Sequence, residues 1–168
     1  MASAFTDDPT IPNSEELWRR IPPWHLVPDP DAGGIRISTQ AFEDDAEDDH
    51  PLSVMLGSVM LAAGGWQAAL AGHDDFGLVL LLTGEVRKLG QIVARDPVDG
   101  QAHALVVGKK TKGVRKALVG KAAWLIPPPG RIILGLDRIP ATWTAGLTVL
   151  DAWKLLLPRL PSPPNPRP

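Results

Sequence analysis

The sequence has no cysteine and no tyrosine among its 168 residues. The absence of cysteine excludes a disulfide scaffold, a thiolate zinc site and a cysteine nucleophile. Charged residues or glycines interrupt every apolar run before it reaches the length that spans a bilayer. The first ten residues, MASAFTDDPT, lack the basic start and the apolar core of a secretory signal. We therefore expect a cytoplasmic protein that does not bind membranes.

The overall charge is small, with a formal net charge of −2. This balance argues against indiscriminate binding to nucleic acid or to an anionic surface, so any such binding needs a local patch. Apolar residues make up 44% of the chain and charged residues 21%, as in ordinary globular proteins. A chain of this length and composition predicts a single folded domain.

Proline and polar residues mark the two ends of that domain. Residues 1–13 are polar and aperiodic and predict a flexible arm, whereas residues 158–168 contain six prolines and predict a polyproline-like or disordered tail. The folded domain is expected over residues 14–157, with residues 129–157 either part of it or peripheral. Between its elements, residues 43–49 carry six carboxylates and predict a solvated loop.

The hydrophobic pattern within the domain favours an α+β fold. Strands are expected at residues 35–38 and 52–56, and the stretches QIVAR and AHALVVG are expected to form an antiparallel hairpin across the turn sequence DPVDGQ. Helical spacing of leucines predicts a helix over residues 74–90. A further short helix and a last strand are expected up to Ile126, followed by a strand at 131–140 and a helix at 144–157. The pattern predicts a small, mostly antiparallel sheet with two to four helices.

The segment GKKTKGVRK, residues 108–116, contains the largest concentration of positive charge in the sequence. It lies where an apolar strand is expected to end and a helix to begin, so the helix dipole adds partial positive charge. The segment predicts an anion-binding site that extends to residue 121. A solvated basic loop, or a partner for the acidic residues 43–49, is the alternative. The side chains assigned to the anion-binding site are Lys109, Lys110, Lys112, Arg115, Lys116 and His103.

The histidines show no pattern of metal ligation. His103 opens an expected strand, where it would assist anion binding, act as a general acid or base, or cap the hairpin. His25, His50 and His73 lie far from it in the sequence. The acidic run lacks the spaced oxygens and turning glycine of a calcium loop. We therefore predict no metal site.

Two short stretches, LWRRI and GGIRISTQAF, carry a local resemblance to known proteins. An arginine on an opening strand and a serine on the next resemble ADP-ribosyltransferase-like toxins, including the RES type. The resemblance implies that Arg19 or Arg20 and Ser38 help to hold NAD, with a later acidic residue at the ribose. The sequence has no glutamate on an expected late strand. Residues 17–128 also resemble short uncharacterised bacterial proteins.

Three functions follow as expectations. The first is a non-enzymatic module that binds an anionic partner, either an acidic protein surface or the phosphate of a nucleotide or nucleic acid, through residues 108–121. The second is an NAD-using ADP-ribosyltransferase-like protein, active or degenerate. The third is an assembly protein that uses its C-terminal helix and tail. Only the second implies a cofactor, and the sequence does not fix the oligomeric state. Nucleic acid is the weaker partner, since double strands need more charge and single strands need stacking aromatics.

Overall fold

The computed structural model describes residues 5–31, 33–44 and 51–130. All of these residues belong to the unit formed by residues 1–138. The strands and helices, in chain order, are β1 Glu16–Ile21, η1 Pro23–His25, β2 Leu26–Pro28, β3 Ile35–Ile37, η2 Thr39–Phe42, β4 Leu52–Leu56, α1 Gly57–Ala62, α2 Trp66–Ala69, β5 Gly77–Leu82, α3 Thr83–Lys88, β6 Ile92–Arg95, η3 Pro97–Asp99, β7 His103–Val107, α4 Lys112–Lys121 and β8 Ala123–Ile126.

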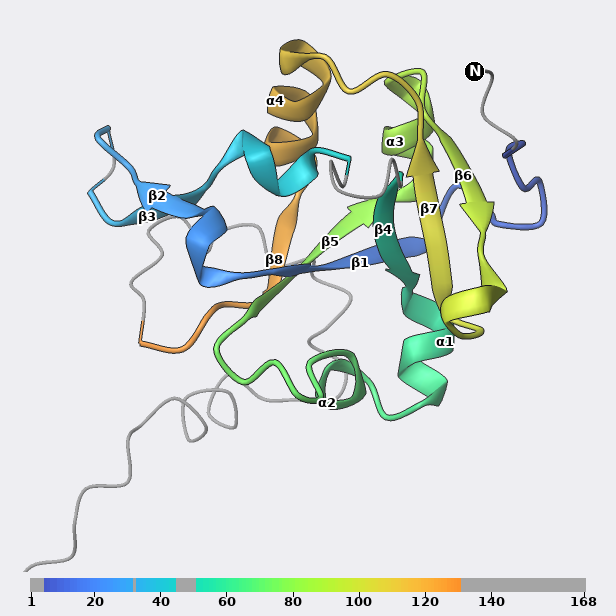
Figure 1. Ribbon diagram of the computed structural model, residues 1–168, viewed down its shortest axis with the longest axis horizontal. Helices are drawn as coiled ribbons and strands as arrows, with labels where there is room; N and C mark the ends of the chain where they lie inside the picture. Colours follow the sequence, from blue (N-terminus) through green and yellow to red (C-terminus); the bar gives the residue numbers. More distant parts are fainter. Residues whose placement is uncertain (1–4, 32, 45–50, 131–168) are drawn as a thin grey trace, which may run out of the picture. The chain divides into compact units, whose positions relative to one another are not determined.

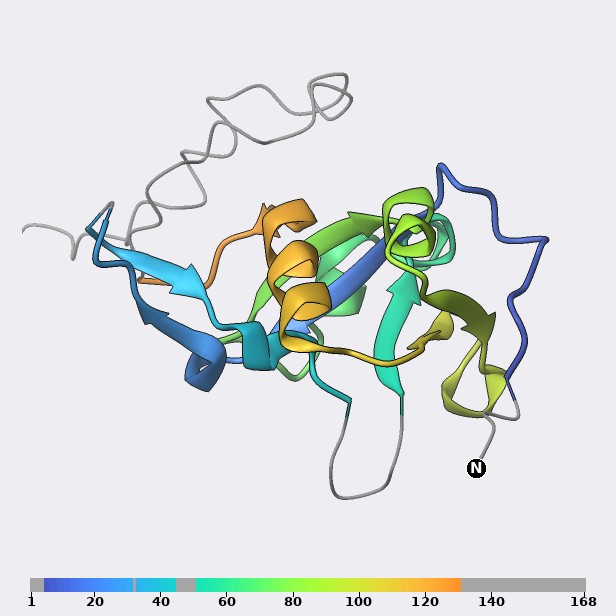
Figure 2. The same ribbon diagram turned by 90° about the horizontal axis from the view of Figure 1, so that it is seen from above.

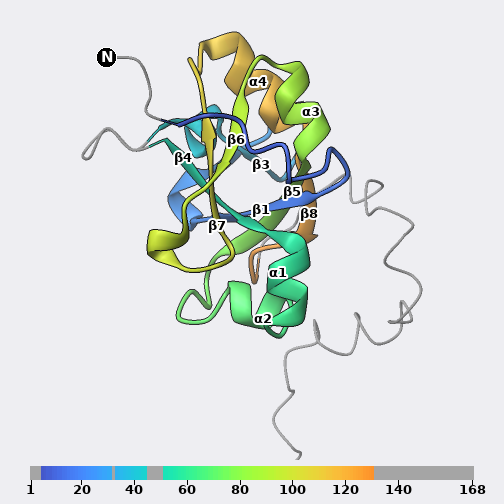
Figure 3. The ribbon, with the colours of Figure 1, turned by 90° about the vertical axis from the view of Figure 1, so that its right-hand side faces the viewer.

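Six strands form one sheet in the order β6-β7-β4-β1-β5-β8, and β2 and β3 form a separate two-stranded ribbon. Each pair of neighbours in both sheets is antiparallel. Helices α3 and α4 lie on one side of the six-stranded sheet, and α1 and α2 lie on the other (Figures 1 and 3). The described residues therefore have the expected α+β fold, with a mostly antiparallel sheet and four α-helices.

The hydrophobic core lies between one face of the sheet and the elements η2, α3 and α4. Alternate residues of the strands point into it, because successive side chains of a strand face opposite sides. η2 adds Phe42 and α4 adds Leu118, both of which are fully buried. The buried strand residues of this core are Leu17, Ile21, Ile37, Leu52, Val54, Leu56, Val79, Leu81, Val93, Ala104 and Val106.

Strands β1 and β4 separate soon after they meet. They pair only at Leu17 with Leu56 and at Trp18 with Met55, whereas β1 pairs with β5 along its whole length. Beyond the paired residues, the side chain of Arg19 bridges the two strands. Its guanidinium donates hydrogen bonds to the carbonyl oxygens of Ser53 (2.7 Å) and Ala41 (2.6 Å). The sheet is thus opened locally at its centre.

The expected helix over residues 74–90 is wrong in its first half. Residues 77–82 form β5, a central strand, and only Thr83–Lys88 are helical, before Gly90 with a φ of 73°. Leu78, Leu80 and Leu81 are almost completely buried on the two faces of the sheet. A strand covered on both faces is apolar at every position, so it also satisfies helical spacing.

The expectation of a flexible arm is wrong for residues 5–13, which pack against the folded domain. The backbone N–H of Asp8 donates to the carbonyl of Val93 (2.8 Å), and the Asp7 carboxylate accepts the Val93 N–H (2.9 Å). Ile11 is 1% exposed and packs in the core. This segment therefore covers the outer edge of β6, which among the described residues has no strand on that side. An unpaired strand edge is costly to leave open, which is a physical reason for the packing.

Other expected elements agree with the structure or lie outside the described residues. The strand at 52–56, the hairpin β6–β7, the helix within 108–122 and the strand ending at Ile126 are confirmed. The strand expected at 35–38 ends one residue earlier, because Ser38 caps η2. The strand at 131–140, the helix at 144–157 and the tail at 158–168 lie outside the described residues. Among the described helices, none is long and apolar enough to cross a membrane.

Candidate functional site

The basic segment lies at the junction that the sequence predicts. β7 ends at Val107 and α4 begins at Lys112, with Thr111 as the capping residue. The hydroxyl oxygen of Thr111 accepts a hydrogen bond from the backbone N–H of Val114 (3.3 Å). In Figure 2, α4 lies beside the cyan segment that contains η2. The segment is therefore attached to a helix start and faces the part of the chain that precedes the acidic run.

Lys110 is a buried structural lysine rather than a free anion ligand. Its side chain is 3% exposed, and its ammonium group lies 2.6 Å from the Asp44 carboxylate. It also donates to the carbonyl oxygens of Val106 (2.8 Å) and Gly108 (3.3 Å). Burial lowers the pKa of Lys110, and the Asp44 carboxylate opposes that shift. Since these contacts use its donors within the fold, the assignment of Lys110 to the anion site is corrected.

Arg115 is also engaged by a carboxylate of this chain. Its guanidinium forms an ion pair with Glu43, which immediately follows η2. Together with the pair between Lys110 and Asp44, this contact joins the basic segment to the first two residues of the acidic run. Glu43 and Asp44 are exposed, as expected of a solvated acidic loop, and they also form the pairing with the basic segment that the sequence offers as an alternative. Arg115 is also withdrawn from the anion-binding set.

Three lysines of the segment remain exposed. Lys109, Lys112 and Lys116 form no ion pair with any residue in the described ranges. Lys112 and Lys116 are four residues apart on α4, so their side chains share one face of the helix. Lys121, at the other end of α4, binds Glu85 (2.5 Å). The exposed part of the basic segment is therefore the group of Lys109, Lys112 and Lys116, called the lysine face below.

His103 does not join the lysine face. It is the first residue of β7, and the basic segment follows the last residue of that strand. A strand rises by about 3.3 Å per residue, so the five residues of β7 separate the two groups. The expectation that His103 assists the lysines in binding one anion is therefore wrong.

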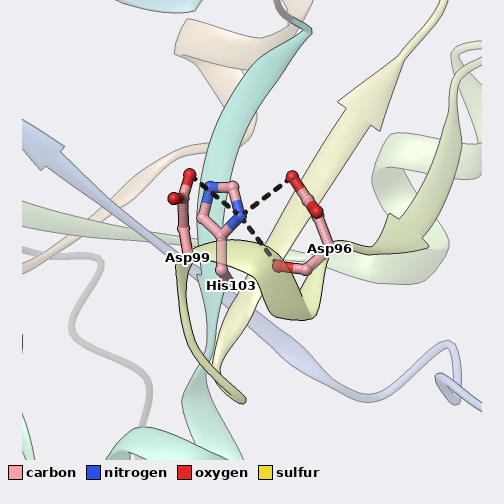
Figure 4. Close-up of side chains that lie close together, drawn as sticks. All are labelled: Asp96, Asp99 and His103. Carbon is pink, nitrogen blue, oxygen red and sulfur yellow. Dashed lines mark hydrogen bonds and ion pairs between the residues drawn. The ribbon is translucent and has the colours of Figure 1, made fainter.

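His103 instead lies among polar side chains at the turn between β6 and β7. Its Nε2 is 2.7 Å from the Ser53 hydroxyl, which comes from the neighbouring strand β4. Its Nδ1 faces Asp96, at 3.1 Å from the carbonyl oxygen and 3.4 Å from the carboxylate, and lies 3.9 Å from the Asp99 carboxylate. Figure 4 shows the two aspartates converging on this ring nitrogen. His103, Asp96 and Asp99 are called the turn cluster below.

Arg19, Arg20 and Ser38 do not form one site. Arg19 and Arg20 are neighbours on β1, so their side chains leave opposite faces of the sheet. The Arg20 guanidinium contacts His73 (3.2 Å) and the sulfur of Met55 (3.7 Å), and burial lowers the pKa of Arg20. The Ser38 hydroxyl accepts the N–H of Gln40 (3.2 Å) as the cap of η2. The serine joined to Arg19 is Ser53, through its carbonyl oxygen.

A shallow groove of about 290 Å³ lies where β1 and β4 separate. Trp24 stands at this groove with 69% of its surface exposed. The groove volume is near the lower end of ordinary small-molecule sites, which range over about 300–1,000 Å³. Its lining residues are Arg19, Trp24, His25, Gln40, Glu43, Asp44, Pro51, Leu52 and Ser53.

Ser53, Asp96 and Asp99 are site residues that the sequence pattern does not predict. The spacing of the histidines gives no sign of the turn cluster, because its other members are aspartates. The signal that was available is the turn sequence DPVDG directly before the strand that His103 opens. Ser53 gives no local signal, because its approach to His103 depends on the pairing of β4 with β7.

Comparisons with known proteins give no family. No protein-family model matches the chain, and no curated protein or solved structure matches it.

Proposed function

We propose that this protein is a binding module that recognises an anionic partner through the lysine face, Lys109, Lys112 and Lys116. The observation that carries the proposal is the exposure of these cations without an ion pair to any described residue. The N-terminus of a helix carries partial positive charge, which repels cations. Helix stability alone therefore does not favour a lysine at position 112. A bound anion would be attracted both by the lysines and by the dipole.

An acidic protein segment is the partner that the surroundings favour. The same segment already binds carboxylates of its own chain, through Lys110 with Asp44 and Arg115 with Glu43. Three exposed lysines are few for a double-stranded nucleic acid, whose affinity depends on the number of phosphates neutralised. The lysine face therefore fits a short run of aspartates and glutamates.

The test compares two double variants that remove the same charge. Lys112→Ala with Lys116→Ala changes the lysine face, whereas Arg36→Ala with Lys88→Ala removes two exposed cations elsewhere. The probes are a fluorescein-labelled oligoglutamate peptide and a single-stranded DNA of equal charge, followed by fluorescence anisotropy at two salt concentrations. We expect the first variant to bind oligoglutamate about 5–10-fold more weakly, because exposed ion pairs contribute about 0–1 kcal/mol each.

Four results bear on the proposal. A control variant that binds like the wild type supports it, and so does a loss of affinity at higher salt. Tighter binding of DNA than of oligoglutamate would shift the partner to nucleic acid. Equal affinities of the two double variants would contradict a specific role for the lysine face.

A second candidate function is NAD binding of the ADP-ribosyltransferase-like kind, at the groove beside Arg19. The specific observation is that Arg19, on β1, lines this groove next to the exposed Trp24, where its guanidinium binds the main-chain carbonyl oxygen of Ser53 on another strand. In the family that the sequence resembles, a strand arginine and a strand serine help to hold NAD. The acidic residues that line the same groove are Glu43 and Asp44.

Incubation with NAD, followed by mass spectrometry for nicotinamide, tests this second function. We expect binding or release with the wild type and its loss in Arg19→Lys. The variant Lys112→Ala with Lys116→Ala should behave like the wild type, which separates the two proposals. If the wild type shows neither NAD binding nor nicotinamide release, NAD is eliminated as a ligand.

A further inference from the structure

The turn cluster places three donor groups around one small volume. Nδ1 of His103 lies 3.4 Å from the nearer Asp96 carboxylate oxygen and 3.9 Å from an Asp99 carboxylate oxygen. All three ligand atoms lie within 4.8 Å of one another. In a tetrahedral zinc site with metal–ligand distances of about 2.0–2.2 Å, neighbouring ligand atoms are about 3.3–3.5 Å apart. The 3.4 Å between Nδ1 and Asp96 matches that geometry. Asp99 would have to move about 0.5 Å closer to Nδ1, and the two carboxylate oxygens, which lie within 4.8 Å of each other, would also have to be about 3.3–3.5 Å apart.

The charges of the cluster also suit a divalent cation. In the described part of the chain, neither Asp96 nor Asp99 forms an ion pair with a lysine or an arginine, and His103 is the basic group that faces both. The nearby Arg95 binds Asp8 instead. Two carboxylates and a neutral imidazole carry a formal charge of −2, which a divalent ion would balance. The side chain of His103 is 13% exposed and that of Asp96 is 23% exposed, so solvent screens these two groups only in part, whereas Asp99 is 71% exposed and would approach the metal from the solvent side.

A separate element supports the far side of the histidine ring. The hydroxyl of Ser53, on β4, lies 2.7 Å from Nε2 of His103. Metal-binding histidines usually donate their second ring N–H to an oxygen acceptor, which fixes the ring and its tautomer. A metal on Nδ1 would replace the hydrogen bond between that nitrogen and the Asp96 carbonyl oxygen (3.1 Å). Nε2 would then carry the proton and donate it to Ser53. Ser53 would then act as a positioning residue for the ligand His103.

An acid–base arrangement of serine, histidine and aspartate is the competing interpretation of these side chains. That arrangement needs one carboxylate at Nδ1, so it gives no role to Asp99. The convergence of a second carboxylate on the same nitrogen favours a metal. From these distances and charges we infer that Asp96, Asp99 and His103 bind a divalent transition-metal ion, Zn²⁺ being the best fit, with water completing the coordination. Ca²⁺ fits poorly because it takes six to eight oxygen ligands.

Zinc titration of the full-length protein tests the inference directly. Isothermal titration calorimetry and equilibrium dialysis should give one Zn²⁺ per chain for the wild type. His103→Asn and Asp96→Asn should each weaken binding by at least about 10-fold, and Ser53→Ala by about 10-fold through the loss of ring positioning. Co²⁺ should produce visible absorption typical of tetrahedral coordination in the wild type, and this signal should be lost in His103→Asn.

The chain offers a control with the same residue types. His73, Asp74 and Asp75 are consecutive, but they are not among the described residues that converge on a metal position. The triple variant His73→Asn, Asp74→Asn and Asp75→Asn should therefore bind Zn²⁺ within about twofold of the wild type. Circular dichroism checks that every variant is folded, and Zn²⁺ should raise the melting temperature of the wild type but not of His103→Asn.

Two results would overturn the metal site. One is the lack of saturable Zn²⁺ binding by the wild type at concentrations up to about 100 μM. A dissociation constant of that size corresponds to a binding free energy of only about −5.5 kcal/mol. The other is equal affinity in the wild type and in folded His103→Asn. Either result would leave His103 as a structural histidine that joins the hairpin turn to β4.

Discussion

Two neighbouring lysines of the basic segment have opposite surroundings. Lys109 is exposed, whereas the side chain of Lys110 is 3% exposed and binds Asp44 together with two backbone carbonyl groups. Burying an ammonium group is unfavourable unless its hydrogen bonds are satisfied. The contacts of Lys110 meet this requirement and also fix the chain between β7 and α4. Lys109 has neither role.

We therefore predict different effects for the same substitution at the two positions. Lys110→Met should destabilise the protein by about 1–3 kcal/mol, because methionine fills similar space but leaves the carboxylate and the carbonyl groups without their donor. The effect should fall short of that for a fully buried pair, since Asp44 is 42% exposed and can be hydrated. Lys109→Met should stay within about 0.5 kcal/mol of the wild type. Urea unfolding measures both, and equal midpoints would show that Lys110 has no structural role.

At the scale of elements, one carboxylate joins two helices. Glu85, in the first turn of α3, lies 2.5 Å from Lys121 at the end of α4 and 2.6 Å from Lys88 within α3. Hydrogen bonds from Lys121 and then from Lys88 lower the pKa of Glu85 to about 2. A carboxylate with a lowered pKa stabilises the folded state when it is ionised. That contribution is present above its unfolded pKa and is lost as the pH falls through the folded value.

Acid unfolding should therefore depend on Glu85. Between about pH 4.5 and about pH 2 the Glu85 carboxylate binds a proton more readily in the unfolded chain than in the folded protein. As the pH falls through that interval, the wild type should therefore lose more stability than Glu85→Gln. Thermal melting at several pH values measures the difference, which should shrink with added salt because the Glu85 side chain is 26% exposed and its lysine partners are more exposed still. Asp74→Asn, at an exposed site, serves as the control and should follow the wild type. A Glu85→Gln profile parallel to the wild type would contradict the assigned contacts.

The elements that the sequence predicts correctly are those with local signals. Turn residues mark the hairpin β6–β7, and alternation marks the strand at Leu52–Leu56. β5 was predicted as a helix because a run of leucines fits either periodicity, and its burial on both faces is a property of the whole sheet. Helices α1 and α2 are not predicted. Helices this short have little stability of their own and form because of their packing against the rest of the fold.

At the scale of the whole molecule, the order and register of the strands decide which side chains come together at each candidate site. The order β7-β4-β1 brings Ser53 to His103 and to Arg19, from three strands that are distant in the sequence. The same arrangement separates His103 from the lysines that lie near it in the sequence. Patterns along the chain can identify charged segments, but they do not show which charges neutralise one another. The pairing of Glu43 and Asp44 with the basic segment is an example.

The central position of β1 has a consequence for biosynthesis. β1 leaves the ribosome before both of its partners, because β4 begins at Leu52 and β5 at Gly77. The N-terminal contact closes later still, since Asp7 and Val93 are separated by 86 positions. A nascent chain would therefore carry an unpaired strand with three large apolar side chains, Leu17, Trp18 and Ile21, while its partners are being made. Chaperones protect proteins from aggregation in such a state.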